Sequence, residues 1–275
     1  MIPILNNPNT TPISDSSNMM DNWRDTNLNV ESLWLIPQRA KGGKRENNYH
    51  GNFIPQIPNQ LISRYTSPND LVMELFSGSG TTLFECETLN RQYIGYDINS
   101  EMIDYVRKKM ENTKIVYSLL ECNVTDTETF ETLTEQSLLH IGKTKVDFLI
   151  AHPPYLDIIK FTDKPGDLSA ISDEKQFLES LQIAFSNAWK YLKVGGYFAV
   201  VMGDLYRNSE ILPLGFDTMA MVKSNFDCKL KGIIVKNISG NRGKLGQNDI
   251  WHYRALKSDY YIFKHEYIFV FKKMN

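Results

Sequence analysis

The sequence predicts an α/β fold built on a doubly wound, mostly parallel sheet of seven strands, without a large separate recognition domain. Short apolar runs typical of buried strands alternate with helix-like segments from about residue 59 onward. Glycines or prolines follow the first and fourth of these runs, at the strand ends where parallel sheets hold ligands. The 275 residues, 42% of them hydrophobic, suffice for the core of one sizeable domain.

Strands and helices alternate along the chain in the order that βαβ units require. A short amphipathic helix over 59–66 comes first. Ser100 is expected to cap the helix that follows the second strand. The expected strands are 70–76, 91–97, 114–124, 146–150, 195–204, 229–237 and 265–273, and the expected later helices are 81–90, 100–113, 127–140, 174–193 and 216–226.

Composition excludes several classes of protein. The formal net charge of −2 is not that of a polycation, so a nucleic-acid partner would need a local basic surface. The three cysteines form no CxxC pair, so we expect neither a metal site nor a disulfide framework. Because the chain shows neither a secretory signal nor an apolar run long enough to cross a membrane, we expect a soluble, cytoplasmic protein.

The organisation of the chain is expected to be simple. Residues 1–32, rich in Asn, Thr, Ser and Asp, are expected to form a loose N-terminal arm, and 33–275 to form the folded domain. Residues 38–48 are polar and basic with two glycines, which favours a mobile loop.

A glycine-rich segment, ELFSGSGTT over 74–82, joins the first strand to the next helix. Glycines at such a turn let the backbone approach a ligand closely. A phosphate-binding P-loop would need a Lys after the last glycine, and the segment has none. A dinucleotide fingerprint would need a third glycine where Leu83 stands. The remaining interpretation is a loop that holds the methionine part of S-adenosylmethionine.

Polar residues follow the next two strands. Asp97 ends the second strand about twenty residues after the glycines, where a carboxylate can accept hydrogen bonds from both ribose hydroxyls of a nucleoside. Asn123 and Asp126 follow the third strand and are candidates for contact with adenine. Capping of the following helix is the alternative for each of these residues.

The most informative run is AHPPY, over 151–155, directly after the fourth strand. Two successive prolines fix the direction of the chain and leave carbonyl groups free to accept hydrogen bonds from an amino group. Tyr155 offers an aromatic face on which a base can stack. We therefore expect a catalytic loop here, beside the glycine-rich loop.

The combination of FSGSGTT with a PPY loop resembles the DNA amino-methyltransferases, which modify adenine N6 or cytosine N4. The resemblance covers about residues 50–205, and PNQLISRYTSPNDLVMELFSGSGTT is similar to the region that leads into the cofactor loop of that family. It implies a Rossmann-like methyltransferase domain over 33–275 with S-adenosylmethionine as cofactor. The predicted cofactor-binding residues are Glu74, Phe76, Ser77, Gly78, Gly80, Thr81, Thr82, Asp97 and Asn123. The predicted catalytic residues are His152, Pro153, Pro154 and Tyr155.

One position departs from the family pattern. The residue before the two prolines is usually Asp, Asn or Ser and bonds the target amino group, whereas here it is His152. A neutral His can accept such a bond through one ring nitrogen. The expected reaction is direct methyl transfer to a base that has been flipped out of the duplex and stacked on Tyr155. The choice between adenine and cytosine stays open.

Basic residues gather late in the chain, with seven Lys or Arg against one acid over 229–257. We expect 204–265 to contact DNA, together with cations of 39–45, whereas the acidic segment 121–140 is expected to face away. A site-specific enzyme of this kind would act on DNA and could have a cognate restriction endonuclease as partner. The residues expected to bind DNA are Lys236, Arg242, Lys244 and Arg254.

Three alternatives remain. The same scaffold could methylate a guanine N2 or another amine in RNA, although no RNA-binding domain is recognisable in the sequence. A protein glutamine methyltransferase is less favoured, because those enzymes prefer NPPY. The chain could also be a catalytically silent module that binds the cofactor or DNA, with His152 marking lost activity.

Overall fold

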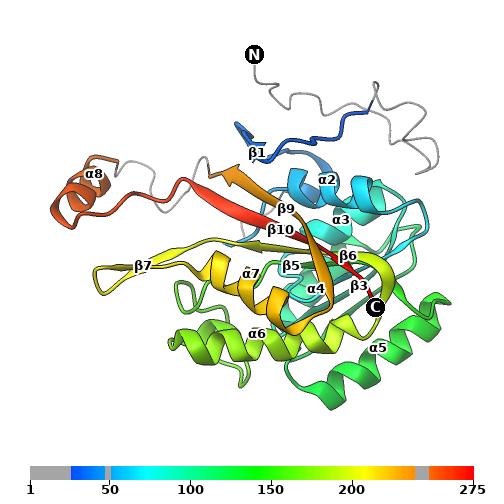
Figure 1. The fold of residues 1–275 in the computed structure, drawn as a ribbon. Helices are drawn as coiled ribbons and strands as arrows, with labels where there is room; N and C mark the ends of the chain where they lie inside the picture. Colours follow the sequence, from blue (N-terminus) through cyan, green and yellow to red (C-terminus); the bar gives the residue numbers. More distant parts are fainter. Residues whose placement is uncertain (1–25, 47–50, 239–247) are drawn as a thin grey trace.

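A computed structural model describes residues 26–46, 51–238 and 248–275 (Figure 1). The main sheet has eight strands: β1 (Leu33–Trp34), β2 (Leu71–Glu74), β3 (Gln92–Asp97), β4 (Tyr117–Glu121), β5 (Val146–Ala151), β6 (Leu192–Met202), β9 (Cys228–Asn237) and β10 (His265–Lys273). The helices are α2 (Gln56–Tyr65), α3 (Thr81–Thr88), α4 (Ser100–Lys109), α5 (Thr127–Ile141), α6 (Glu174–Trp189), α7 (Leu214–Asn225) and α8 (Asn248–Lys257).

The order of the strands, β1-β9-β10-β6-β5-β2-β3-β4, confirms the doubly wound sheet. All paired strands are parallel except β10, which runs antiparallel to both of its neighbours. Successive strands β2, β3 and β4 move toward one edge, and β5 then returns to the other side of β2. This reversal makes a topological switch point at the carboxyl ends of β2 and β5, where such sheets bind ligands. The sheet has one strand more than expected, because β1 pairs with β9.

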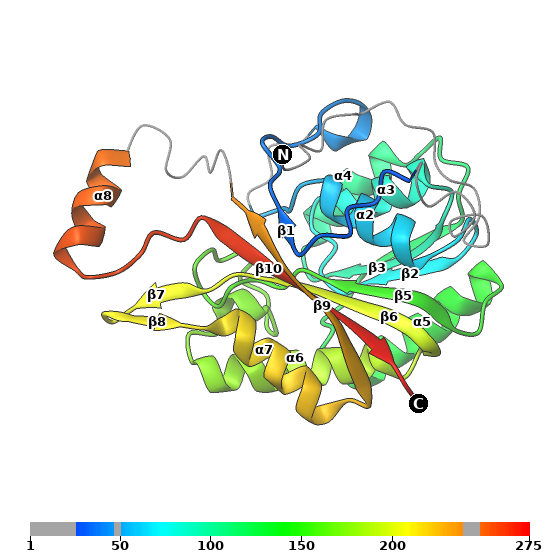
Figure 2. The ribbon, with the colours of Figure 1, turned by 45° about the horizontal axis from the view of Figure 1, so that its top comes forward.

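Helices cover both faces of the sheet (Figure 2). Helices α2, α3 and α4 lie on one face and α5, α6 and α7 on the other. Alternation along β6 shows the two-sided core: Phe198, Val200 and Met202 belong to the cluster under α5–α7, whereas Ala199 and Val201 belong to the cluster under α2–α4. The central strands are therefore mostly apolar on both faces, as is typical of buried parallel strands.

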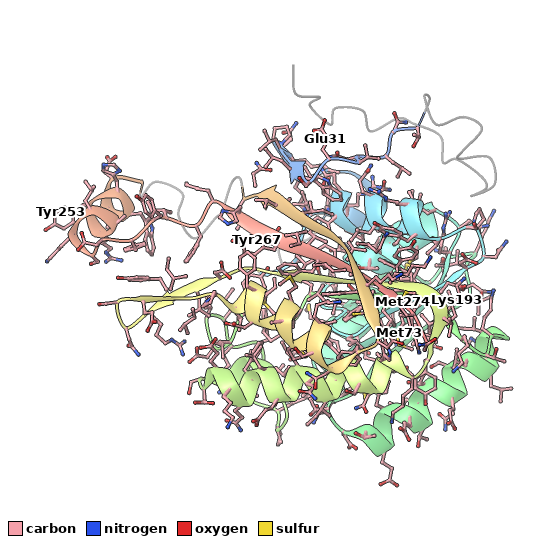
Figure 3. All side chains as sticks on the ribbon, viewed as in Figure 1. Glu31, Met73, Lys193, Tyr253, Tyr267 and Met274 are labelled. Carbon is pink, nitrogen blue, oxygen red and sulfur yellow. The ribbon has the colours of Figure 1, made fainter. Side chains whose placement is uncertain are left out.

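Two elements project from the sheet on the side where β6 ends and β10 begins (Figure 2). They are the hairpin of β7 (Leu205–Arg207) with β8 (Glu210–Leu212), and α8. Tyr206 of the hairpin stacks on Tyr260 with ring centroids 4.3 Å apart, and its hydroxyl donates to the Ser258 carbonyl at 2.9 Å. Tyr253 of α8 is 63% exposed and lies far out on this projection (Figure 3). We call the hairpin, α8 and 258–264 the arm.

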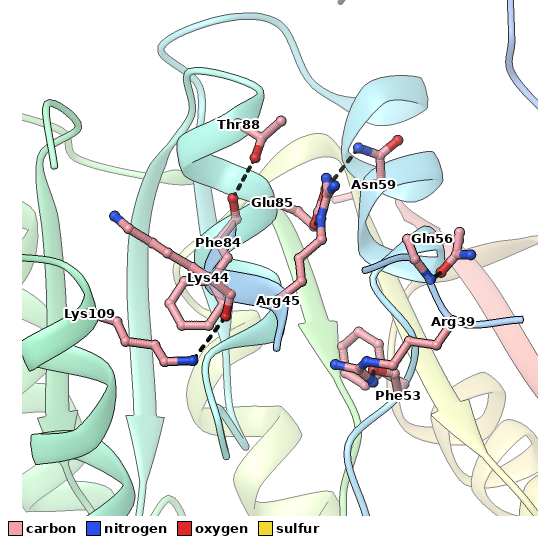
Figure 4. Close-up of polar contacts among 11 residues, drawn as sticks. Arg39, Lys44, Arg45, Phe53, Gln56, Asn59, Phe84, Glu85, Thr88 and Lys109 are labelled. Atoms are coloured by element: carbon pink, nitrogen blue, oxygen red, sulfur yellow. Dashed lines mark hydrogen bonds and ion pairs between the residues drawn. The ribbon is translucent and has the colours of Figure 1, made fainter. Parts of the chain in front are cut away.

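The segment expected to be a mobile basic loop is instead tied to α3 as far as it is described (Figure 4). A short 3-10 helix over Gly43–Arg45 places Lys44 2.7 Å from Glu87 and Arg45 2.6 Å from the buried Glu85. Arg39 donates to the Phe53 carbonyl at 2.9 Å. These three cations make contacts within the fold, and the contact of residues 39–45 with DNA stays a prediction.

The residue that caps α4 differs from the one expected. The side chain of Asn99, not that of Ser100, caps α4 by accepting from the Glu101 and Met102 amides. No helix among the described residues is long and apolar enough to cross a bilayer. Residues 1–25 of the expected loose N-terminal segment 1–32 lie outside the described residues. Arg242 and Lys244 lie outside them as well.

Candidate functional site

A pocket of about 720 Å³, counted with its open mouth, lies at the switch point of the sheet. Its walls come from the segments that follow β2, β3, β4 and β5, together with 51–53 and 161–168. The predicted residues that line it are Phe76, Ser77, Gly78, Thr81, Asp97, Asn123, His152 and Pro154. The topology thus brings most of the predicted site residues to one cavity.

The glycine-rich loop turns sharply between β2 and α3. Gly78 and Gly80 both have positive φ angles, 48° and 80°, which residues with a Cβ rarely adopt. A Cβ on Gly80 would also lie 2.7 Å from Val106 Cγ1 of α4. The turn is closed by the Gly80 amide, which donates to the Ser77 carbonyl at 2.9 Å. Gly80 therefore shapes the loop from behind, while Gly78 lines the pocket.

Asp97 stands at the end of β3 with its carboxylate held from two sides. Its Oδ2 accepts from the Gly78 amide at 2.6 Å and its Oδ1 from the Asn99 amide at 2.8 Å. Burial raises the pKa of Asp97, while these amide bonds oppose the rise. Each carboxylate oxygen keeps a further lone pair, so the group can also accept from a ligand in the pocket.

Glu74 does not line the pocket, although it is among the predicted cofactor-binding residues. It lies beneath the loop, where Oε1 accepts from Thr82 Oγ1 at 2.5 Å and Oε2 from the Tyr93 hydroxyl at 2.6 Å. Tyr93 in turn bonds Ser77 Oγ at 2.8 Å. Thr82 is fully buried. Glu74 and Thr82 thus support the loop from inside the protein, and the prediction that they contact the cofactor is replaced by this supporting role.

The buried position of Glu74 gives stability a particular pH dependence. Desolvation raises its pKa from 4.5 to about 8. Between these values the unfolded chain has released a proton that the folded chain retains, so this group's contribution falls as pH rises. Glu74→Gln mimics the protonated acid. We expect urea unfolding from pH 5 to 8.5 to show stability declining less steeply in the variant, with a difference of at most ~5 kcal/mol. Parallel curves would contradict this role.

Asn123 and Asp126 have different positions in the structure, one in the pocket wall and one at the start of α5. Asn123 lines the pocket, and its Oδ1 accepts from Thr125 Oγ1 at 2.8 Å. A Cβ on Gly166 would lie 2.2 Å from Asn123 Nδ2, so the 161–168 segment closes tightly over it. Asp126 instead caps α5 by accepting from Thr129. The capping alternative therefore holds for Asp126, and Asn123 remains the candidate for ligand contact.

The predicted catalytic loop follows β5 directly. His152 lines the pocket and meets the edge of Phe53, with ring centroids 4.9 Å apart. Burial lowers the pKa of His152 to about 4, so the imidazole is neutral near pH 7. Its Nε2 lies 3.1 Å from the Tyr155 hydroxyl. Pro153 is buried and Pro154 lines the pocket, so the loop presents His152 and Pro154 to the cavity.

The prediction that Lys236 binds DNA is wrong. This residue is 5% exposed and its Nζ lies 2.9 Å from Glu266 Oε1, so it is a buried ion-pair partner and not a phosphate ligand. Arg254 is exposed on α8, with its guanidinium carbon 5.4 Å from the centroid of the Trp251 ring. Of the described residues predicted to bind DNA, Arg254 is the one on an open surface.

The pocket fits an adenosylated amino acid by two observations. Thr81 Oγ1 is buried at the pocket wall without a hydrogen-bond partner among the described residues, so it is available to a polar ligand. The Asp97 carboxylate lies in the same pocket beside a backbone turn with positive φ angles, next to largely apolar walls. A polar end and a hydroxyl-bearing ring can therefore be held at once.

Sequence interpretation missed several residues of this region. Asn52 and Phe53 come from the segment before α2, where Asn52 Nδ2 donates to Ser79 Oγ at 3.0 Å. Phe161 and Gly166 come from a loop without a recognisable motif. Glu266 had a detectable signal, because it is a lone carboxylate in the otherwise apolar run EYIFVF.

Comparisons with known proteins show similarity to methyltransferases. A family model described as a methyltransferase domain matches residues 66–256, and one described as a DNA methylase matches residues 6–108. In the fold comparison, a SAM-dependent methyltransferase from Methanosarcina mazei covers 78% of this chain and 97% of its own at 13% identity, with a TM-score of 0.48.

Curated relatives match over shorter stretches. The Type II methyltransferase M.XycI of Xanthomonas campestris pv. cyanopsidis is 29% identical over 30% of this chain and 26% of its own. The orphan methyltransferase M.BamHII of Bacillus amyloliquefaciens is 28% identical over 33% of this chain and 35% of its own. M1.MboII of Moraxella bovis, a Type II methyltransferase, is 43% identical over 18% of this chain and 21% of its own. The matched stretch thus spans about a third or less of each of these relatives.

The resemblance stated from FSGSGTT and PPY is confirmed, and S-adenosylmethionine is the cofactor that the family and the pocket indicate. The stretch matched by the methyltransferase-domain family, residues 66–256, contains the glycine-rich loop, Asp97, the PPY loop and the central strands that bring them together. The chain belongs to the methyltransferase-domain family, and its residues 6–108 are similar to the DNA methylases.

Proposed function

We propose that the protein transfers a methyl group from S-adenosylmethionine to an exocyclic amino group of a base in DNA, at adenine N6 or cytosine N4. The observation that carries the proposal is the neutral His152, which stands with Pro154 in the wall of the cofactor pocket. The bound cofactor supplies an electrophilic methyl group. The residues of this chain supply position, hydrogen-bond acceptors and exclusion of water.

Cofactor binding is assigned to the loop after β2 and to Asp97. Asp97 would accept from the ribose hydroxyls, since its carboxylate is held rigidly by the Gly78 and Asn99 amides. Thr81 Oγ1 would bond the polar end of the cofactor, which gives this buried atom a partner. Phe76 and Asn123 would border the adenine, since both line the pocket.

The amino nitrogen of a base is weakly nucleophilic because its lone pair is delocalised into the ring. Acceptors for its two hydrogens favour a tetrahedral nitrogen and free that lone pair. A ring nitrogen of neutral His152 is one such acceptor, and the backbone carbonyls freed by the two prolines are others. Oriented groups of this kind stabilise the developing charge without reorganisation.

DNA is proposed to approach from the carboxyl edge of the sheet. A base inside a duplex cannot reach the pocket, so it would be flipped out and stacked beside Tyr155. The arm projects from the same edge and carries exposed Arg254 and Lys257. These residues would contact phosphates, and the arm supplies most of the surface for site-specific recognition. A cognate restriction endonuclease remains a prediction from the resemblance.

The test is to incubate the purified protein with S-adenosylmethionine tritiated in the methyl group and unmethylated DNA, and to identify the labelled nucleoside after digestion. Label in N6-methyladenine or N4-methylcytosine supports the proposal and identifies the base. Label in RNA or protein under the same conditions would overturn the DNA assignment. Cofactor binding without any transfer would favour a silent module.

A further inference from the structure

A chain of polar side chains extends from the catalytic loop into the sheet. Lys236 of β9 and Glu266 of β10 are directly opposite each other in the antiparallel ladder, and both are buried. Glu266 Oε1 accepts from Lys236 Nζ at 2.9 Å. Glu266 Oε2 accepts from the Tyr155 hydroxyl at 3.3 Å, and that hydroxyl lies 3.1 Å from His152 Nε2.

The stability of the fold does not by itself explain this series of hydrogen-bonded side chains. A buried ion pair loses much of its Coulombic gain to desolvation, and apolar residues of similar volume are often as stable in its place. The surroundings of this pair are apolar, since Ile234 and Ile268 neighbour it along the same sheet face. Glu266 is linked through the Tyr155 hydroxyl to His152, which lines the pocket, and this indicates a role in the site.

The directions of the hydrogen bonds follow from the chemistry of the groups. Tyr155 has one hydroxyl proton, and an ionised carboxylate is a stronger acceptor than a neutral imidazole nitrogen. The Glu266 carboxylate forms an ion pair with Lys236 Nζ at 2.9 Å. Tyr155 therefore donates to Glu266, and its oxygen is left to accept a hydrogen bond from His152 Nε2–H. Nε2 is then the protonated nitrogen of His152.

The other ring nitrogen is thereby fixed as a bare acceptor. A neutral imidazole carries one proton, so Nε2–H leaves Nδ1 with a free lone pair. Among the described residues, no side chain or backbone group is hydrogen-bonded to Nδ1, and His152 lines the cofactor pocket. The opposite tautomer would present an N–H to the target amino group and would repel it.

We propose that Glu266, the ion-pair partner of Lys236, is a positioning residue that acts through the Tyr155 hydroxyl to hold His152 as the Nε2–H tautomer, so that Nδ1 accepts from the target amino group. The inference rests on the proposed function for its last step. It assigns the Tyr155 hydroxyl a role that stacking of a base does not require. It also explains why this chain can use His where the family pattern has Asp, Asn or Ser.

The decisive variant is Tyr155→Phe, which keeps the aromatic face and removes the hydroxyl. If Tyr155 only stacks a base, kcat is unchanged. We call the series of hydrogen bonds from Glu266 through Tyr155 to His152 the relay. If the relay sets the tautomer, kcat falls at least ~10-fold while KM for DNA stays within about twofold. Tyr267→Phe is the matched control, because Tyr267 lies next to Glu266 on β10 and its hydroxyl bonds His265 instead. We expect Tyr267→Phe to retain the kcat of the parent protein.

A second measurement reads the tautomer without using activity. Long-range ¹H–¹⁵N spectra of the ¹⁵N-labelled protein distinguish protonated from bare ring nitrogens, and His152→Asn identifies the His152 signals among the five histidines. We expect Nε2 protonated and Nδ1 bare in the parent protein and in Tyr267→Phe. Tyr155→Phe and Glu266→Leu combined with Lys236→Met should show a mixture of tautomers.

The outcomes separate the two proposals. A parent protein with Nδ1 protonated overturns the relay, whatever the activity. An unchanged tautomer in Tyr155→Phe and in the Glu266→Leu/Lys236→Met protein also overturns it. The expected spectra, together with label appearing only in RNA or protein, would uphold the proton placement and overturn the DNA assignment. The expected spectra together with the fall of kcat on DNA support both.

Discussion

His152→Ala is expected to lower kcat for DNA methylation about 10²- to 10³-fold, while leaving the affinity for S-adenosylmethionine within about twofold. The substitution removes one acceptor for the target amino group but leaves Asp97 and the glycine-rich loop in place. Since that acceptor acts mainly as the amine becomes tetrahedral, the loss should fall on kcat and not on cofactor binding. Single-turnover kinetics and calorimetry measure the two effects separately.

His152→Asn is the matched control for this prediction. The amide oxygen of Asn restores an acceptor at the same position, and Asn is among the residues that the family pattern has there. We therefore expect Asn to recover part of the rate lost in Ala. Equal losses in both variants would show that His152 acts by packing against Phe53 and not as an acceptor.

Asp97→Asn is expected to weaken S-adenosylmethionine binding about 10- to 100-fold, measured by calorimetry. Hydrogen bonds to a charged group contribute about 1.5–3 kcal/mol each, and the amide would keep one acceptor but lose the charge and present a donor to the second hydroxyl. Asn also places an NH₂ group near the Gly78 or Asn99 amide, which now donates to Asp97.

The control for Asp97 is Asp126→Asn, which follows the next strand and caps α5 on an exposed surface. Asn is an equally good cap, so cofactor affinity should not change. Unaltered affinity in Asp97→Asn, with the fold intact by circular dichroism, would remove Asp97 from the cofactor site.

Much of the site could be predicted because a parallel sheet collects the residues that follow its strands. Gly78, Asp97, Asn123 and His152 are far apart in sequence but follow neighbouring strands, so finding the strands was enough to bring them together. Glu74 was misassigned because it is the last residue of β2 and not part of the loop that follows the strand. In a strand covered on both faces, its side chain points into the core rather than into the pocket.

Lys236 shows where counting charge fails. Over 229–236 the residues alternate, with Lys229 and Lys231 exposed and Ile234 and Lys236 buried. Charge density along the chain placed all these cations on one surface, whereas the two-residue period of a strand places Lys236 on the inner face. The partner Glu266 stands in another strand, so the pair depends on a register that the sequence alone does not specify.

The prediction of a mobile loop over 38–48 was wrong for a related reason, as far as the structure describes it. The segment's polar, glycine-containing composition is typical of a mobile loop, yet Lys44 and Arg45 are held by Glu87 and Glu85 of α3. Those contacts join residues about forty positions apart, and local composition carries no information about them. Glu85 itself sits in a helix that the sequence predicted correctly, but its burial depends on the segment that covers it.

The arm and the sheet are joined in a way that bears on how such a protein can diversify. Asn237 and His265 are paired residues of adjacent strands, so the points where the polypeptide leaves β9 and enters β10 are neighbours. Ends held together by the ladder make the closure cost of the intervening chain rise only slowly with its length. Under the proposed function, the DNA-contacting surface between these strands is therefore free to change in length and sequence, while β9 and β10, with Glu266, keep their pairing.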